Sequence, residues 1–75
     1  MSGFYLMHCV DGDECLVAHT ADFPECESKL REWAASDGRA ALSIWSAGGQ
    51  ILAVWDNRKR RLTMTRAGEA LPCWR

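Results

Sequence analysis

Residues 22–38 read DFPECESKLREWAASDG, and this segment carries the clearest helical pattern in the chain. Asp22 can cap a helix, Pro24 suits its first turn, and Glu25 completes an Asp-x-x-Glu form of the capping box. The apolar residues recur at helical spacing along one stripe, made of Phe23, Cys26, Leu30, Trp33 and Ala34. We therefore predict one amphipathic helix here, followed by Gly38 in position for a left-handed cap.

Segments with the alternation of β-strands lie on both sides of this helix. The predicted strands cover residues 4–10, 14–21, 40–46, 50–56 and 61–66. Asp11-Gly12-Asp13, Gly48-Gly49 and the turn at residues 57–60 separate neighbouring strands. The order is ββαβββ, which predicts an α+β fold: a five-stranded antiparallel sheet with the helix packed on one face. We expect a single domain over residues 1–75, with residues 67–75 as a loosely ordered tail.

The composition is that of a globular chain with little room for a core. A chain of 75 residues buries only about 60% of its unfolded surface. Four Trp residues and a 48% apolar content indicate that packing supplies much of the stability. The net charge of −1 hides an asymmetry, because residues 1–38 carry eight acids and two bases while residues 39–75 carry two acids and seven bases. An uneven distribution of charge along the chain says more about its binding partners than about its fold.

The chain shows no targeting or membrane signal. It has no apolar run long enough to cross a bilayer. Its start, Met1-Ser2-Gly3-Phe4, lacks the basic region of a signal peptide. We therefore expect no membrane partner and a cytoplasmic location, where thiols are mostly reduced.

Turn lengths predict which residues share a face of the sheet. A two-residue turn at Gly48-Gly49 places Trp45 opposite Leu52, and a four-residue turn at residues 57–60 places Asp56 opposite Arg61. The predicted core face then consists of Leu42, Ile44, Ile51, Ala53, Trp55, Leu62 and Met64.

The opposite face carries an apolar group that a monomer has little reason to expose. Trp45, Leu52 and Val54 lie there among Ser and Thr residues. One interpretation is a contact with a partner, for which Trp is a favoured anchor. A symmetric dimer through the Trp45 face is a variant of it. The other interpretation is that Leu71, Pro72 and Trp74 fold back and cover this face.

A basic run occupies the last predicted hairpin turn. Arg58, Lys59, Arg60 and Arg61 are consecutive. A basic β-ribbon can contact phosphates, and binding of that kind weakens steeply with salt. An acidic protein surface would suit these residues equally well. A turn whose charges keep sheet edges apart is the simplest alternative.

Neither a metal site nor an active site is predicted. Cys9, Cys15, Cys26 and Cys73 contain no Cys-x-x-Cys pair. A three-residue first turn would place Cys9 opposite Cys15, whereas a two-residue turn would not. Cys9 and His8 are neighbours on a strand, so their side chains point to opposite faces. No phosphate loop or paired carboxylates are present. We expect no cofactor and no catalytic residue, hence a binding protein and not an enzyme.

The residues Ile44, Gly49, Leu52-Ala53 and Lys59-Arg60, which follow a short amphipathic helix and two strands, resemble a known family. The likeness is to the small phage-encoded anti-CRISPR proteins, closest to the ββαβββ kind that inhibits type I surveillance complexes. It covers the helix and the three strands after it, about half the chain. The chain departs from the family in having Arg58 where a turn glycine is expected, and in extending past the last strand through Trp74.

The resemblance implies a protein that docks on a CRISPR effector subunit in a bacterial host cell and blocks the effector's use of DNA. It also implies that Lys59 and Arg60 lie at the binding surface. The leading hypothesis is therefore an inhibitory protein of phage or mobile-element origin that binds a host protein complex. It would bind through Arg58, Lys59, Arg60, Arg61, Trp45, Leu52 and Val54. The alternatives are a nucleic-acid-binding accessory protein that uses the basic hairpin directly, and a self-associating structural protein.

Overall fold

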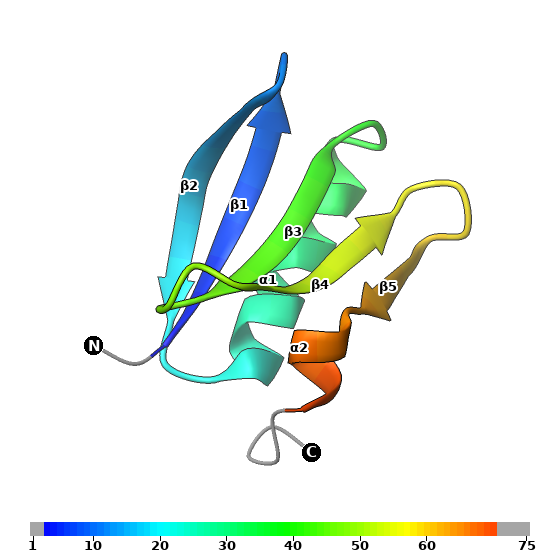
Figure 1. The fold of residues 1–75 in the computed structure, drawn as a ribbon. Helices are drawn as coiled ribbons and strands as arrows, with labels where there is room; N and C mark the ends of the chain where they lie inside the picture. The colour runs from blue at the N-terminus through cyan, green and yellow to red at the C-terminus, as the bar shows by residue number, and fades with distance from the viewer. Residues whose placement is uncertain (1–2, 71–75) are drawn as a thin grey trace.

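The computed structural model describes residues 3–70 and confirms the predicted ββαβββ order. The strands are β1 Phe4–Val10, β2 Asp13–Thr20, β3 Ala41–Ser46, β4 Ile51–Asp56 and β5 Arg61–Met64. The helices are α1 Phe23–Ser36 and a short α2 Arg66–Glu69. All five strands form one antiparallel sheet in the order β2-β1-β3-β4-β5 (Figure 1). Among the described residues, no helix is long and apolar enough to cross a membrane.

The β1–β2 hairpin closes through a two-residue turn at Asp11 and Gly12. Both have positive φ values, 51° and 86°, the conformation that Asp-Gly turns favour. Val10 consequently pairs with Asp13, and Cys9 pairs with Glu14. The two-residue alternative is the correct one, and Cys9 does not face Cys15.

Helix α1 begins as predicted and ends differently. The Asp22 carboxylate accepts the Glu25 backbone N–H at 2.8 Å, which is the expected N-cap bond. At the other end, Asp37 is extended, with φ −131°, and its N–H donates to the Trp33 carbonyl at 2.9 Å. Gly38 is not among the residues with positive φ. The predicted left-handed cap at Gly38 is wrong because the chain already leaves the helix in an extended conformation at Asp37.

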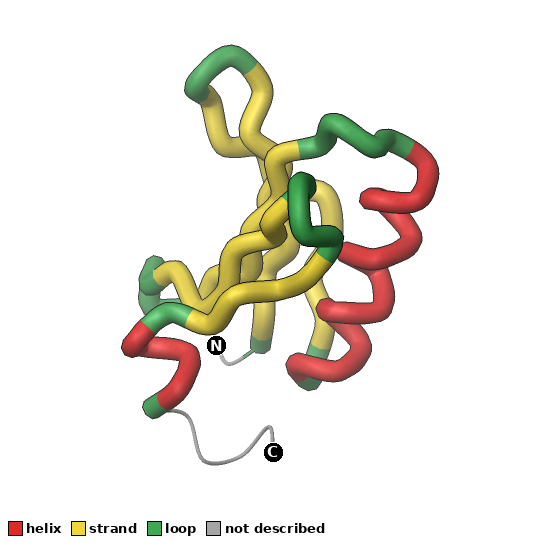
Figure 2. Tube along the Cα trace, turned by 90° about the vertical axis from the view of Figure 1, so that its right-hand side faces the viewer, coloured by secondary structure: helices red, strands yellow, loops and turns green. Residues whose placement is uncertain are grey.

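The core lies between α1 and one face of the sheet (Figure 2). On the helix, the buried residues are Phe23, Cys26, Leu30 and Ala34. On the sheet, they include Leu6, Leu42, Ile44, Ala53 and Trp55. Trp33, the fifth residue of the predicted stripe, is 36% exposed, so the stripe is narrower than its periodicity indicates.

The β3–β4 hairpin pairs Ile44 with Ala53, as the predicted register requires, but differs from it by one residue next to the loop. The Ser46 N–H donates to the Gln50 carbonyl at 2.8 Å, so three residues and not two form the loop, with Gly49 at φ 86°. A bulge next to Ile44 then places Trp45 opposite Ile51, where Leu52 was expected. Ile51 therefore shares the face of Trp45, and its assignment to the core face is wrong: it is 39% exposed.

The last strand is shorter than predicted, because β5 stops at Met64. Thr65 caps α2, its Oγ1 accepting the Gly68 N–H at 3.2 Å. Helix α2 lies on the side of the sheet away from α1 and packs against β4 (Figure 2). Residues 66–69 are thus helical where a strand end and a loose tail were expected. Leu71, Pro72 and Trp74, the predicted cover of this face, lie outside the described residues.

Candidate interaction surface

Two rows of side chains cross the sheet on the face away from α1. In one row, Tyr5 pairs with Trp45, which pairs with Ile51. In the other row, Ser43 pairs with both Met7 and Val54. Leu16 extends the second row onto β2, opposite Met7. Directly opposed residues share a face, so together they form what we call the open face: Tyr5, Met7, Leu16, Trp45, Ile51 and Val54.

The open face is apolar and partly exposed. Leu16 is 56% exposed, Val54 44% and Ile51 39%, whereas Tyr5, Met7 and Trp45 are half-buried. Two contacts fix the positions of the aromatic rings. Trp45 donates from Nε1 to the Ser43 hydroxyl at 2.8 Å, and Tyr5 stacks on His19 with ring centroids 4.5 Å apart. This face is therefore a pre-ordered apolar surface, of the kind that marks interaction sites.

Leu52 was predicted to form an apolar partner contact together with Trp45 and Val54, but it is only 1% exposed. It does not belong to the core cluster under α1. The segment that leads into α2 lies beside it, since the Thr65 N–H donates to the Leu52 carbonyl at 2.9 Å. Leu52 therefore lies where β4 meets the segment that leads into α2. Of the predicted apolar set, Trp45 and Val54 remain accessible.

The basic run lies at the β4–β5 turn, and Asp56 organises this turn. One Asp56 carboxylate oxygen accepts the backbone N–H of Arg58 at 2.9 Å and that of Lys59 at 3.1 Å. The Lys59 N–H bond is the main cause that holds the Asp56 pKa below its ordinary value, with a further contribution from the Arg58 N–H. Asp56 pairs with Arg61 as predicted. Their side chains form no salt bridge, unlike those of Arg31 and Glu27, which lie 2.8 Å apart.

Arg60 differs from its three basic neighbours. Its Nη2 donates to the Ala34 carbonyl in the last turn of α1 at 3.1 Å. Its guanidinium carbon also lies 5.4 Å from the ring centroid of Trp55, within the range of a cation–π contact. All four bases are exposed, but Arg60 joins the turn to the helix.

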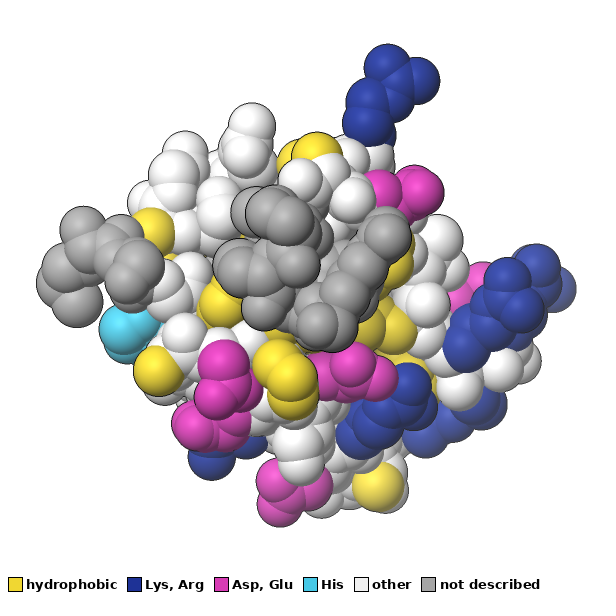
Figure 3. Space-filling view, turned by 90° about the horizontal axis from the view of Figure 1, so that it is seen from below, with side chains coloured by type: hydrophobic (Ala, Val, Ile, Leu, Met, Phe, Trp, Pro, Cys, Tyr) yellow, Lys and Arg dark blue, Asp and Glu magenta, His cyan; other side chains and the backbone are white. Residues whose placement is uncertain are grey.

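Arg61 lies on the side of the open face, and Arg58 and Lys59 lie in the turn that precedes it. Arg61 lies opposite Asp56, in the same alternation as Val54, so it belongs to that side of the sheet. Figure 3 shows Lys and Arg side chains gathered mainly toward one side of the molecule, where Figure 1 places the β4–β5 hairpin. The arrangement is an apolar surface with positive charge along one border.

The described residues do not form a metal centre. No group of three or more His, Cys, Asp or Glu side chains within residues 3–70 is arranged to hold a metal ion. Cys26 is buried, Cys15 exposed and Cys9 between the two. Burial raises the pKa of the Cys26 thiol, which a hydrogen bond with Thr20 opposes in part.

Sequence reasoning missed four residues of the open face. Tyr5 and Met7 alternate on β1, Leu16 lies on β2, and Ile51 was assigned to the core. The alternation within residues 4–10 could have revealed the first two. The order of strands was needed to see that β1 lies beside β3 and therefore joins the surface around Trp45.

A scan of protein-family models, a search of curated proteins and a search of solved structures each found no match to this chain.

Proposed function

We propose that this chain is a small inhibitory binding protein of phage or mobile-element origin, which docks on a host protein complex through the open face and the adjacent basic turn. The observation that carries the proposal is the exposed apolar surface bordered by Arg58, Lys59 and Arg61. A surface of this composition fits a protein partner that presents apolar residues beside an acidic patch.

The resemblance to anti-CRISPR proteins supplies the specific target, a subunit of a type I CRISPR effector complex. The channel of an effector that binds nucleic acid is itself basic, so it would repel a basic turn. The turn suits an acidic border of such a channel, or an acidic subunit near it. Occupation of that border would block the use of DNA by steric exclusion.

The aliphatic residues favour a protein partner over direct binding of nucleic acid. Leu16, Ile51 and Val54 can neither donate to phosphate nor stack on a base as aromatic rings do. Nucleic-acid binding through the turn alone would rest mainly on Arg58, Lys59 and Arg61, because the Arg60 side chain is held to α1. Such binding would be weak and would fall steeply with salt.

The test uses two sets of variants and a purified, nuclease-treated type I effector complex. Val54→Glu should weaken binding to the effector and inhibition of its DNA binding at least tenfold, because a carboxylate would be buried at the contact. Val10→Glu is the matched control: Val10 is 46% exposed, close to the 44% of Val54. It lies near the β1–β2 turn, away from the proposed contact, so it should leave binding unchanged.

The second set reverses charge. Arg58→Glu, Lys59→Glu and Arg61→Glu combined should slow association, and the difference from wild type should shrink at high salt. Arg39→Glu, at an exposed base outside the turn, is the control. Arg60 stays unchanged because its side chain holds the turn to α1.

Three results would refute the proposal. One is inhibition that survives Val54→Glu. Another is nucleic-acid binding by the isolated protein with a steep salt dependence, which supports the accessory-protein alternative. The third is a dimer by light scattering that Val54→Glu converts to a monomer, which supports self-association.

A further inference from the structure

Strand β2 is an open edge of the sheet. The strand order starts with β2, and within residues 3–70 no strand lies beyond it. Along an antiparallel edge strand, alternate residues direct their backbone N–H and C=O groups outward, free to pair with another chain. At eight residues, β2 is twice as long as β5, the edge strand at the other side, which has four.

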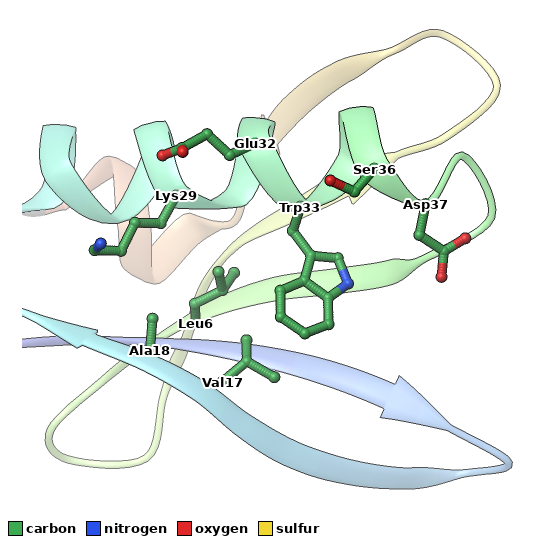
Figure 4. A pocket seen from close by; sticks show the side chains of 8 residues that line it. All are labelled: Leu6, Val17, Ala18, Lys29, Glu32, Trp33, Ser36 and Asp37. Carbon is green, nitrogen blue, oxygen red and sulfur yellow. The ribbon is translucent and has the colours of Figure 1, made fainter.

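A groove runs beside this edge, between β2 and α1 (Figure 4). It encloses about 510 Å³ and has an apolar floor of Leu6, Val17 and Ala18. Trp33 points down from α1 into this space, with the floor residues below it (Figure 4). The His8 ring lies 5.3 Å from the Trp33 ring, at an interplanar angle of 57°. The volume suits one large apolar side chain or a short row of smaller ones.

A bulge in β2 helps to form the floor of the groove. Leu6 pairs with Ala18 and Met7 pairs with Leu16, so Val17 is the extra residue on β2. Val17 and Ala18 both line the groove, whereas two successive residues of a regular strand would point to opposite faces. The bulge therefore adds apolar surface next to the free edge.

The border of the groove is acidic. Glu32, Asp37 and a single base, Lys29, line it on the helix side. Asp11, Asp13 and Glu14 lie at the exposed β1–β2 turn, where β2 begins. This charge is opposite to that of the β4–β5 turn, so the groove is separate from the open face in both place and chemistry.

We propose that the β2 edge and this groove bind an extended, basic and apolar segment of a partner protein as a sixth strand. The backbone of the segment pairs with the outward groups of β2. Every second side chain then points toward the groove, and the largest of them packs on Trp33. Lys or Arg residues of the segment meet Glu32 and the acids of the first turn.

A second copy of the chain suits the site less well. A second copy's β2 would bring the acids of its own first turn to an acidic border, and β5, the other edge strand within residues 3–70, offers four residues. Two of those, Leu62 and Met64, pack against the copy's own core. A separate flexible segment can match the full length of β2.

The experiment pans a random decapeptide library against the full chain. Enriched sequences should alternate apolar residues with Lys, Arg or Thr. A labelled synthetic copy of one enriched peptide is then the probe. Two versions of the probe are made, each N-methylated at one of the two sets of alternate amides. The version methylated at the amides that pair with β2 should lose binding, because its hydrogen-bond donors are removed. Backbone NMR shifts should concentrate on β2 and on the second half of α1.

Variants separate the groove from other surfaces. Trp33→Ala should weaken binding of the probe at least tenfold, as loss of an aromatic anchor does. Glu32→Lys should weaken it about threefold at 0.1 M salt and less at 1 M. Leu16→Ala is the control, because it lies on the same strand but faces the open face. Circular dichroism establishes that each variant is folded.

The proposal is overturned if panning enriches nothing, or if the enriched peptides are acidic or lack alternation. Equal binding by wild type and Trp33→Ala also overturns it, as does an NMR footprint on the open face. A wild-type dimer that Glu32→Lys dissociates would assign the site to a second copy.

Discussion

The Arg60 side chain donates a hydrogen bond to the Ala34 carbonyl oxygen, 26 positions earlier in the chain, at 3.1 Å. Its guanidinium also lies over the ring of Trp55. The bond satisfies one of the carbonyl groups that the end of a helix leaves without a partner. One member of a run of four bases is therefore part of the fold.

Arg60→Ala should lower the free energy of unfolding by about 1 kcal/mol, from the lost hydrogen bond and cation–π contact. The backbone strain at φ 55° stays the same, because Ala keeps the Cβ atom. Urea denaturation measures the change. Lys59→Ala, in the same turn but with an exposed side chain, should change stability by less than about 0.5 kcal/mol. Equal effects of the two substitutions would contradict the structural role of Arg60.

Gly68→Ala should separate α2 from the sheet. A Cβ atom at Gly68 would overlap the Leu52 carbonyl oxygen and lie 2.7 Å from Met64 Cε. We expect a loss of about 1–3 kcal/mol and faster hydrogen exchange of the Thr65 amide, which bonds to Leu52. Gly48→Ala is the control, because its nearest neighbour, Ser46 Oγ, would be 3.7 Å away. Unchanged exchange at Thr65 would show that α2 tolerates the methyl group.

Asp56 should titrate below its ordinary value of 3.8, because its carboxylate accepts the Lys59 and Arg58 N–H bonds. A lowered pKa means that the folded state binds fewer protons than the unfolded state at low pH. The resulting stability is present above pH 3.8 and is lost as the pH falls through the folded pKa. Carboxyl NMR titration gives the midpoint directly. Asp56→Asn should be less stable than wild type at pH 7, and this difference should vanish in acid. A midpoint at or above 3.8 would rule out the turn as the cause.

The cysteines should differ widely in reactivity. Cys15 is exposed, whereas Cys26 is fully buried and its pKa is raised by burial. The thiolate is the reactive form, so Cys26 should react only when the domain opens. Pulsed alkylation followed by peptide mapping should label Cys15 first and Cys26 last. Urea should remove the difference, which serves as the control. Early labelling of Cys26 in the native protein would indicate a looser core than the structure shows.

Local signals predicted the start of α1 and the presence of the first hairpin, although they left the length of its turn open. The Asp22 cap involves residues three apart, and Asp11-Gly12 adopts the turn that this pair favours. The β4–β5 register was also predictable, because the four-residue turn leaves Asp56 opposite Arg61. In each case the interacting groups are close in sequence, so composition and spacing are sufficient.

The candidate interaction surface was predicted only in part. Trp45 and Val54 are accessible as expected, but the bulge in β4 placed Ile51 on the open face, and the segment that leads into α2 lies beside Leu52. Ile51 became exposed and Leu52 became buried. A shift of one residue moves a side chain to the other face, and the loop's sequence, with two adjacent glycines, does not specify its length.

The sequence by itself determined the order of the elements, the start of α1, and the division into an acidic first half and a basic second half. These depend on residues that are neighbours in the chain. The tertiary structure alone decided which strands are adjacent, which apolar residues remain exposed, and which bases are free to bind. It brought Tyr5 beside Trp45 and Arg60 to the end of α1, and it formed the groove under Trp33. The physical reason is that bulges and contacts between distant segments choose the face of each side chain, and neither leaves a local signal.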